Sequence, residues 1–315
     1  MILAKNMQHT PLISVIIPTY NRADLLPRAV RSACEQTYTN LEILIVDDAS
    51  SDNTEEVAKK LEQEDTRVRY IKREENGGGS AARNTGIKQS EGKYIALLDS
   101  DDEWFNEKIE KQLELLEKNT CQNIGLIYCG FIRKKNSETK SQFTPKHRCD
   151  ISKDLLGKNV VGGCSGVLVK KECFDTCGLF DESPEIRSGG AQDYELWLRI
   201  AQKYSFDFIP QSLFFYYLHK QNMTKTNKAL DRIRALEYIS KKYSDLYKQN
   251  PLLFAEQLKT QGVTLLESGD HKLARRKFKE SLKEHYDATV LLRYILAFSP
   301  RLFYHNLKNI KNILK

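Results

Sequence analysis

The sequence predicts an α/β protein with a mostly parallel central sheet, followed by a helical C-terminal region. Four apolar runs begin at residues 13, 41, 68 and 94, so their starts are spaced by 28, 27 and 26 residues. A helical pattern follows each run, and this alternation is typical of right-handed βαβ units in a parallel sheet. The second and fourth runs are almost wholly apolar, as expected for strands that are covered on both faces.

Each repeated unit consists of a strand, a polar turn and a helix. Ser50, Ser51 and Asp52 stand directly before the second helix, where such residues cap a helix N-terminus. In chain order, the expected strand and helix pairs are 13–20 with 23–36, 41–48 with 54–64, 68–73 with 80–89, and 94–99 with 106–118.

The pattern after residue 119 is less regular. Strands are expected at 124–132, 160–170 and 206–209, with a polar loop at 134–150 and a helix at 193–203. From residue 228 onward the pattern is helical, and residues 262–284 fit either one tetratricopeptide-type helix pair or an ordinary helical hairpin with a Gly-Asp turn. We therefore expect two domains, residues 1–225 and residues 226–315.

Composition and charge exclude several classes of protein. The chain is 40% hydrophobic and 29% charged, which argues against disorder. No basic region precedes the first apolar run, and no run reaches the ~18 residues of a membrane span, so neither a signal peptide nor a spanning helix is expected. Of the net charge of +7, residues 228–315 carry +9 and residues 1–227 carry −2. Because nucleic-acid enzymes usually surround their cleft with basic residues, no nucleic-acid partner is expected.

Seven cysteines are scattered along the chain, an odd number without the spacing of a disulfide framework. Cys173 and Cys177 form a C-x3-C pair with Cys149 and Cys164 upstream, so a zinc site is one alternative. Buried reduced thiols are the favoured interpretation, and a cytoplasmic location follows as the default.

Ligands of open α/β sheets bind beyond the carboxyl ends of the strands, so the residues there are candidates for a site. They include a tyrosine, a glycine loop and five carboxylates. These residues are Pro18, Thr19, Tyr20 and Asn21 after the first strand, Asp47 and Asp48 after the second, 76–79 after the third, and Asp99, Ser100, Asp101 and Asp102 after the fourth.

The acidic turn at residues 99–102 (DSDD) follows a buried strand directly. Carboxylates this close repel one another unless a cation lies among them, and a divalent ion held by one or two carboxylates keeps positions free for phosphate oxygens. The alternative is a strand-end turn that caps the next helix. The other polar motifs at the same edge favour the metal site.

The segment NGGGSAARN (residues 76–84) is a glycine loop that opens a helix. Its glycines, Gly78 among them, allow a ligand to approach the backbone closely, and the helix N-terminus favours an anion. Arg83, one helical turn further on, either reaches a phosphate or lies on the helix surface. Gly77, Gly79 and Ala82 also mimic a dinucleotide-binding fingerprint, but that fingerprint belongs in the first βα turn, where this chain has PTYN.

Four further side chains each have a functional and a structural interpretation. Asp48 accepts hydrogen bonds from a base or ribose, or caps a helix, and Tyr20 stacks on a base or packs at the strand end. Asp193 opens the helical stretch YELWLRIAQK as its N-cap or acts as a general base. His219 is a metal ligand or a partly buried structural histidine.

Five segments occur in a fixed order: VIIPTYNR, IVDDASSDNT, NGGGSAARNTG, YIALLDSDD and AQDYELWLR. Their order, spacing and placement at strand ends resemble those of the family 2 inverting glycosyltransferases. The resemblance covers residues 12–220. It implies a Rossmann-like GT-A fold, with residues 1–225 as the catalytic domain and a nucleotide-diphospho-sugar as the donor.

The resemblance also implies donor-binding roles for residues at the strand ends. Thr19, Tyr20 and Asp48 match residues that hold the nucleotide base and ribose, and Arg83 matches an arginine near the base and the diphosphate. The expected donor-binding set is Pro18, Thr19, Tyr20, Asp48, Gly78, Arg83, Asp99 and Ser100.

A metal site and a general base are implied in the same way. Asp99 and Asp101 match the D-x-D carboxylates, with Asp101 as the expected ligand of Mn2+ or Mg2+ and Asp99 near the ribose. His219 is the looser match for a second metal ligand. Asp193 matches the general base, although the family usually has Glu-Asp where this chain has Gln192-Asp193. The implied reaction is a metal-dependent, inverting sugar transfer, with UDP as the favoured nucleotide, to a hydroxyl of a glycan, a lipid-linked glycan or another acceptor.

Two functions of other kinds are alternatives. A nucleotidyltransferase also combines a parallel sheet, a nucleotide and a metal, but it usually has a glycine-rich basic loop after the first strand, where this chain has PTYNR. A noncatalytic module that binds sugar nucleotides would not need Asp99, Asp101 and Asp193 together.

Residues 301–315 carry apolar residues at helical spacing, with lysines and asparagines on the other face. Such a helix either lies on an anionic membrane surface or packs on the catalytic domain. The first alternative predicts a peripheral membrane enzyme at the inner face of the cell membrane, in cell-surface polysaccharide biosynthesis.

Overall fold

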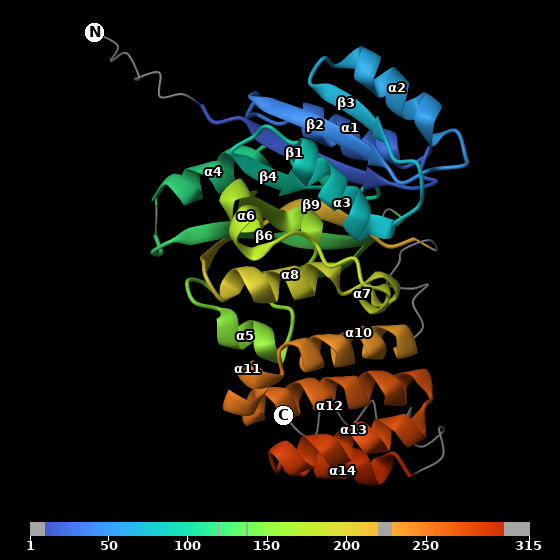
Figure 1. Cartoon of the computed structure of the whole chain (residues 1–315), viewed down its shortest axis with the longest axis vertical. Helices are drawn as coiled ribbons and strands as arrows, with labels where there is room; N and C mark the ends of the chain where they lie inside the picture. Colours follow the sequence, from blue (N-terminus) through green and yellow to red (C-terminus); the bar gives the residue numbers. More distant parts are fainter. Residues whose placement is uncertain (1–9, 119, 137, 220–228, 299–315) are drawn as a thin grey trace. The chain divides into compact units, whose positions relative to one another are not determined.

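The computed structural model describes residues 10–118, 120–136, 138–219 and 229–298, and the chain divides into two compact units (Figure 1). The sheet unit comprises Met1–Ser152, Val160–Ser183 and Gln192–Asn222. The helical unit comprises Lys153–Asn159, Pro184–Ala191 and Met223–Lys315. A domain boundary at residue 225 stays a prediction.

One sheet forms the centre of the sheet unit. Its strands are β1 (Ile13–Thr19), β2 (Leu41–Asp47), β3 (Val68–Lys72), β4 (Tyr94–Leu97), β5 (Glu103–Trp104), β6 (Ile124–Lys135), β7 (Glu138–Phe143), β8 (Val167–Lys170) and β9 (Ser205–Tyr217). The order across the sheet is β3-β2-β1-β4-β8-β6-β9-β5, and β7 pairs with β6. Six of the nine strands share one direction, and β5, β7 and β8 run against them. The predicted α/β class with a mostly parallel central sheet is confirmed.

Helices cover both faces of this sheet. The helices of the sheet unit are α1 (Leu26–Cys34), α2 (Thr54–Glu64), α3 (Gly78–Gln89), α4 (Lys108–Lys118), α6 (Lys171–Cys177) and α8 (Gln192–Ala201), with a short 3-10 turn, η1 (Cys164–Gly166). The side chains of Val15 and Ile17 enter one buried core with apolar residues of α1, α2 and α4. The α3 helix packs on the other face, because a Cβ on Gly86 would lie 2.5 Å from the side chain of Ile16.

Three expected elements of the sheet unit differ from the structure. The polar segment expected as a loop at 134–150 contains β7, whose outward side chains are exposed, so a period-two apolar signal is lacking. The strand expected at 160–170 is only Val167–Lys170, because Gly162 takes a φ of +91° and the chain turns into η1 before the strand begins. The strand expected at 206–209 extends over Ser205–Tyr217.

The helical unit consists of α5 (Ser152–Gly157), α7 (Pro184–Gly189), α10 (Ala229–Lys242), α11 (Ser244–Gln249), α12 (Pro251–Ser268), α13 (His271–Glu284) and α14 (Ala288–Leu296). The helix pair expected around a Gly-Asp turn is α12 and α13. Gly269 ends α12 with a φ of +93°, and the Asp270 carboxylate accepts the N–H of Leu273 at 3.0 Å to cap α13. Gly262 lets the two helices approach, because a Cβ there would lie 2.5 Å from the Phe278 ring.

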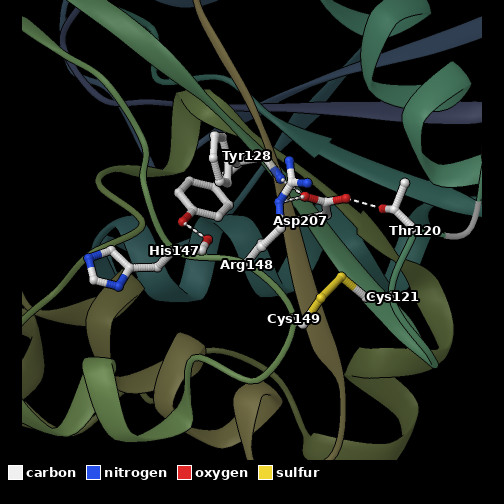
Figure 2. Close-up of a disulfide and its surroundings, with 8 residues drawn as sticks. Thr120, Cys121, Tyr128, His147, Arg148, Cys149 and Asp207 are labelled. Atoms are coloured by element: carbon white, nitrogen blue, oxygen red, sulfur yellow. Dashed lines mark hydrogen bonds and ion pairs between the residues drawn. A yellow bond between two sulfur atoms is a disulfide. The ribbon is translucent and has the colours of Figure 1, made fainter.

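The expectation that all cysteines are reduced thiols is wrong for one pair: Cys121 and Cys149 form a disulfide (Figure 2). The two residues meet because the segment after β7 returns to the sheet, where Cys149 exchanges backbone hydrogen bonds with Phe206 of β9. Arg148 pairs there with the buried Asp207 carboxylate at 3.2 Å. None of these contacts leaves a signal in the cysteine spacing, so the pair was not predictable from it.

The remaining cysteines are free thiols at positions 34, 129, 164, 173 and 177. Within the described residues, the group of side chains able to hold a metal consists of aspartates, and the C-x3-C pair is not part of such a group. No helix in the described ranges is both long and apolar enough to cross a bilayer. Residues 301–315, for which membrane contact or packing is expected, lie outside the described residues.

Candidate functional site

The ends of β1, β2 and β4 lie next to one another at one edge of the sheet. Thr19 pairs with Asp47 across β1 and β2, and the Asp48 N–H donates to the Thr19 carbonyl at 2.9 Å. The N–H of Leu98, after β4, donates to the Ile16 carbonyl at 3.0 Å, so the acidic turn begins beside β1. The candidate residues after these strands are therefore neighbours in space.

Asp48 holds the glycine loop. Its carboxylate accepts the N–H of Gly77 at 3.0 Å and that of Gly78 at 2.6 Å, and it forms an ion pair with Arg73. The anion expected at the N-terminus of α3 is thus a side chain of the protein itself. Asp48 is almost wholly buried, and its carboxylate caps α3; a part in donor binding stays a prediction.

The glycines of this loop are needed for steric reasons. Gly78 has a φ of +84°, which disfavours other residues. A Cβ on Gly79 would lie 2.9 Å from Nη1 of Arg83 and 3.1 Å from Oε1 of Gln192. A side chain at Gly79 would therefore push apart the pair formed by Arg83 and Gln192.

Arg83 connects three parts of the site. Its Nη2 donates to Oδ1 of Asp99 at 2.5 Å, and its Nη1 donates to Oε1 of Gln192 at 2.9 Å. Asp99 belongs to the acidic turn, and Gln192 begins α8, directly before Asp193. The interpretation of Arg83 as a surface residue is thus wrong, because its side chain is buried between α3, the acidic turn and α8.

Three carboxylates gather in the acidic turn. One ligand atom each of Asp99, Asp101 and Asp102 lies within 4.8 Å of the others. Burial and the charges of the other two aspartates raise the pKa of Asp102 well above its ordinary value. Such crowding is the condition under which a divalent cation stabilises a site.

Asp102 is fixed by the protein. Its Oδ2 accepts the hydroxyl of Ser165 at 2.5 Å, and its Oδ1 accepts the N–H of Tyr217 at 3.3 Å. Asp102 is 1% exposed, whereas the other two aspartates are only partly buried. The accessible carboxylates are therefore Asp99 and Asp101.

The His219 side chain contacts the acidic turn at Asp101. Its Nε2 lies 2.7 Å from Oδ2 of Asp101, and Nη2 of Arg22 lies 4.0 Å from the same oxygen. Burial alone would raise the pKa of Asp101, but the hydrogen bond to His219 and the charge of Arg22 lower it below its ordinary value. Asp101 is thereby kept ionised, the form in which a carboxylate binds a metal.

Ser165 is a site residue that the sequence analysis missed. Besides holding Asp102, its hydroxyl accepts the N–H of Asp99 at 3.1 Å. Its carbonyl accepts the indole N–H of Trp104 at 2.7 Å, and the next carbonyl, of Gly166, accepts the Gln112 amide at 2.8 Å. The signal in the sequence is the segment GGCSG (residues 162–166), a serine among glycines inside an expected strand.

Asp193 lies in the first turn of α8 and is partly exposed. Its Oδ1 accepts the N–H of Tyr194 at 2.7 Å, which orients the carboxylate. Its charge raises the pKa of the buried Cys164 thiol beside the acidic turn, an effect in which burial is the largest cause. Asp193 directly follows Gln192, which is joined through Arg83 to Asp99, so this end of α8 lies close to the acidic turn.

Several polar atoms at this edge have no hydrogen-bond partner among the residues that the structure describes. They are Oγ1 of Thr19, Oγ of Ser80 and Nε of Arg83, all buried. Buried polar atoms are nearly always paired, so atoms like these point to a bound molecule or water. Tyr20 is 46% exposed, which suits a side chain that stacks on a ligand.

Pro18 and Ser100 complete the expected donor-binding set. Pro18 pairs with Val46 in the centre of the sheet, and Ser100 is buried inside the acidic turn. Their part in donor binding stays a prediction.

Sequence comparisons agree on one family. The family model described as "Glycosyl transferase family 2" matches residues 14–174. An uncharacterized glycosyltransferase of Rickettsia prowazekii is 33% identical over 84% of this chain and 78% of its own length. The putative teichuronic acid biosynthesis glycosyltransferase TuaG of Bacillus subtilis is 33% identical over 61% of this chain and 73% of its own length. The UDP-Glc:alpha-D-GlcNAc-diphosphoundecaprenol beta-1,3-glucosyltransferase WfgD of Escherichia coli is 34% identical over 60% and 69%, respectively.

Two solved structures have a similar fold. TarS 1–349 of S. aureus in complex with UDP-GlcNAc gives a TM-score of 0.65 at 16% identity, over 93% of this chain and 91% of that one. The mannosyltransferase PcManGT of Pyrobaculum calidifontis in complex with GDP-Man and Mn2+ gives a TM-score of 0.59 at 17% identity, over 98% and 82%. At these identities the likeness concerns the fold.

Proposed function

The chain belongs to glycosyl transferase family 2 and has the GT-A fold, and on this basis we propose that it moves a sugar from a nucleotide-diphospho-sugar to a hydroxyl group, with inversion and with Mn2+ or Mg2+. One observation carries the proposal. The acidic turn meets His219 at Asp101, while Arg83 joins the same turn to the start of α8. Carboxylates suited to a cation, the buried Arg83 guanidinium and the residue proposed as the base thus belong to the sheet edge where ligands of such folds bind.

The residues present fit a divalent cation. Asp101 and His219 offer an ionised carboxylate and an imidazole 2.7 Å apart, and carboxylate oxygens of Asp99 and Asp102 lie within 4.8 Å of that of Asp101. Carboxylate oxygens suit Mg2+ and Mn2+, and an imidazole nitrogen shifts the preference toward Mn2+. We therefore assign Asp101 and His219 as the metal ligands, with Asp99 toward the ribose of the donor.

A nucleoside diphosphate is the donor chemistry that the site fits. The unpartnered buried atoms of Thr19 and Ser80 would take up polar groups of the nucleotide, and Tyr20 is exposed for stacking on its base. TarS is described with UDP-GlcNAc and PcManGT with GDP-Man, so related folds accept either base. UDP remains our proposed nucleotide.

The chain's own groups supply the remaining chemistry. A cation bound at Asp101 would neutralise diphosphate charge and improve the leaving group. Arg83 presents a buried positive charge beside Asp99, where it would stabilise the same charge. Asp193 accepts the proton of the acceptor hydroxyl while that oxygen attacks the anomeric carbon from the side opposite the leaving group. A single displacement of this kind inverts the configuration.

The acceptor class is proposed from the relatives. WfgD is named for a lipid-diphosphate-linked GlcNAc acceptor and TuaG for teichuronic acid biosynthesis, so a cell-surface polysaccharide on a lipid carrier is the proposed acceptor. An acceptor of that kind would bring the protein to a membrane surface. The basic excess of residues 228–315 suits such a contact.

A donor panel tests this function. The protein is incubated with UDP-, GDP- and dTDP-sugars, with and without Mn2+, and released nucleoside diphosphate is measured. Release from one donor that depends on Mn2+ supports the proposal, and the anomeric configuration of the product is then read by NMR. Mn2+-dependent binding of a nucleotide without any release or transfer would instead identify a noncatalytic module.

A further inference from the structure

We propose that Arg28 is a positioning residue that fixes the acidic turn and the end of β9 at the separation that metal binding requires. Arg28 lies on α1, and its hydrogen bond to the acidic turn goes to a backbone carbonyl, not to an assigned ligand atom. The inference rests on the proposed function, in which Asp101 and His219 hold the cation. It concerns how these two residues are kept together, which no family likeness addresses.

The first contact of Arg28 is with the acidic turn itself. Its Nη2 donates to the backbone carbonyl of Asp101 at 2.6 Å. A bond to the backbone constrains the turn without using the Asp101 carboxylate, which stays available beside His219. The backbone of the metal ligand is therefore tied directly to α1.

The second contact is with the end of β9. The Arg28 guanidinium lies over the ring of Tyr217, 3.8 Å from its centroid, in the geometry of a cation–π interaction. Tyr217 is two residues before His219, and its own N–H donates to Asp102 at 3.3 Å. One planar side chain thus bridges the segments that carry the two proposed ligands.

Glu103 closes this arrangement. Its Oε2 accepts the hydroxyl of Tyr217 at 2.5 Å and lies 4.0 Å from Nε of Arg28. Glu103 begins β5, which pairs with β9 at Phe215.

Arg28 is well suited to positioning and poorly suited to supporting the core. Its side chain is 33% exposed, whereas its neighbours Leu26, Ala29 and Val30 form the buried face of α1. Its ion pair with Glu103 is long, 4.0 Å, and a long ion pair near the surface contributes little to stability. The planar guanidinium both stacks and donates, which a lysine ammonium cannot do in the same geometry.

Direct Mn2+ binding tests the inference without an activity assay. Free Mn2+ is measured by EPR in titrations of the wild type, Arg28→Met and Arg28→Lys, with urea unfolding of each variant. The matched control is Arg31→Met, on the exposed side of the same helix. We expect the Kd for Mn2+ to rise about tenfold in both Arg28 variants, as when groups that orient metal ligands are removed, and to stay unchanged in the control.

The outcomes separate this inference from the proposed function. If the wild type and Arg28→Met bind Mn2+ equally well, Arg28 has no positioning role, while the metal site stands. If the wild type itself binds no Mn2+, the metal assignment fails and this inference with it. Should Arg28→Met not fold, Tyr217→Leu decides in its place: it removes the ring on which the Arg28 guanidinium stacks but keeps the backbone N–H that donates to Asp102, and an unchanged Kd for Mn2+ in that variant overturns the proposal.

Discussion

Nε2 of His219 lies 2.7 Å from Oδ2 of Asp101, although 118 positions separate the two residues in the chain. The sheet brings them together. β5 follows the acidic turn immediately and pairs with the last part of β9, Glu103 opposite Phe215, just before His219. The pairing of the two-residue strand β5 with β9 thus brings the two proposed metal ligands together.

Replacement of Asp101 should abolish metal-dependent nucleotide binding. Asp101→Ala removes the carboxylate that faces His219, so we expect the affinity for UDP in the presence of Mn2+ to fall to the value measured with EDTA. Isothermal titration with and without Mn2+ measures this. Glu107→Gln, an exposed carboxylate on the loop before α4, serves as control and should behave as the wild type. An Asp101→Ala variant that still binds UDP more tightly with Mn2+ would remove Asp101 from the metal site.

Asp193→Asn should retain donor binding and lose turnover. The amide is nearly isosteric but cannot accept the proton of the acceptor hydroxyl, and a general base contributes about 10²–10⁴-fold to the rate. We expect kcat to fall within that range while the Kd for the donor changes less than threefold, and Asp175→Asn, an exposed change, provides the comparison. Turnover at the wild-type rate would exclude Asp193 as the base.

Much of the fold and of the site edge was predictable from the sequence, for a local reason. The strand and helix periods of the first hundred residues are strong because β1, β2 and β4 are buried on both faces. Since strand ends in a parallel sheet share one edge, the motifs after these strands had to lie together. The proximity of Asp48, Asp99 and Asp101 therefore follows from the order of strands and motifs in the chain alone.

What the sequence did not show depends on contacts between distant segments. The cap that Asp48 forms on the glycine loop depends on the pairing of β2 with β3, and the role of Ser165 depends on a glycine turn that interrupts an apolar run. β7 is an exposed edge strand, so its polar sequence resembles a loop. Neither local propensity nor spacing encodes such contacts.

Ser165→Ala should weaken metal binding without touching a proposed ligand. The variant leaves the buried Asp102 with one hydrogen bond fewer and frees the N–H of Asp99. We expect a Kd for Mn2+ raised by about 10–100-fold and a free energy of unfolding lowered by about 1–3 kcal/mol. Ser165→Thr, which keeps a hydroxyl, should recover part of the affinity. Metal affinity equal to the wild type in Ser165→Ala would show that the turn holds its shape without this bond.

Reduction of the disulfide between Cys121 and Cys149 should destabilise the protein. The bond closes a loop with a sequence separation of 28 residues, for which chain entropy predicts a loss of about 2–4 kcal/mol on reduction. Urea unfolding with and without dithiothreitol measures the difference. The double variant Cys121→Ser/Cys149→Ser is the control, because its stability should not respond to the reductant. Equal stability of the oxidised and reduced wild type would show that the loop is held by its other contacts, such as Arg148 with Asp207.

The amount by which buried Lys108 lowers the free energy of unfolding should depend on pH. Lys108 is wholly buried, with Nζ donating to Gln112 at 2.8 Å and lying 4.1 Å from the Trp104 ring centroid. Burial lowers the pKa of Lys108 to about 8, from 10.5 in the unfolded chain. The native state therefore releases this proton at lower pH than the unfolded state, and stability rises as the pH increases from about 8 toward 10.5.

Lys108→Met tests this linkage because it removes the buried charge but keeps an apolar side chain of similar length. The free energy of unfolding of the variant should exceed that of the wild type at pH 7, and this difference should shrink by about 2–3 kcal/mol between pH 7 and pH 10. The reason is that native Lys108 loses its proton over that interval, so the wild type is no longer destabilised by a buried charge. Urea unfolding at the two pH values measures it, with Lys111→Met on the exposed side of α4 as control. A difference between variant and wild type that is the same at both pH values would mean that Lys108 stays charged in the native state throughout, held by Gln112 and the Trp104 ring.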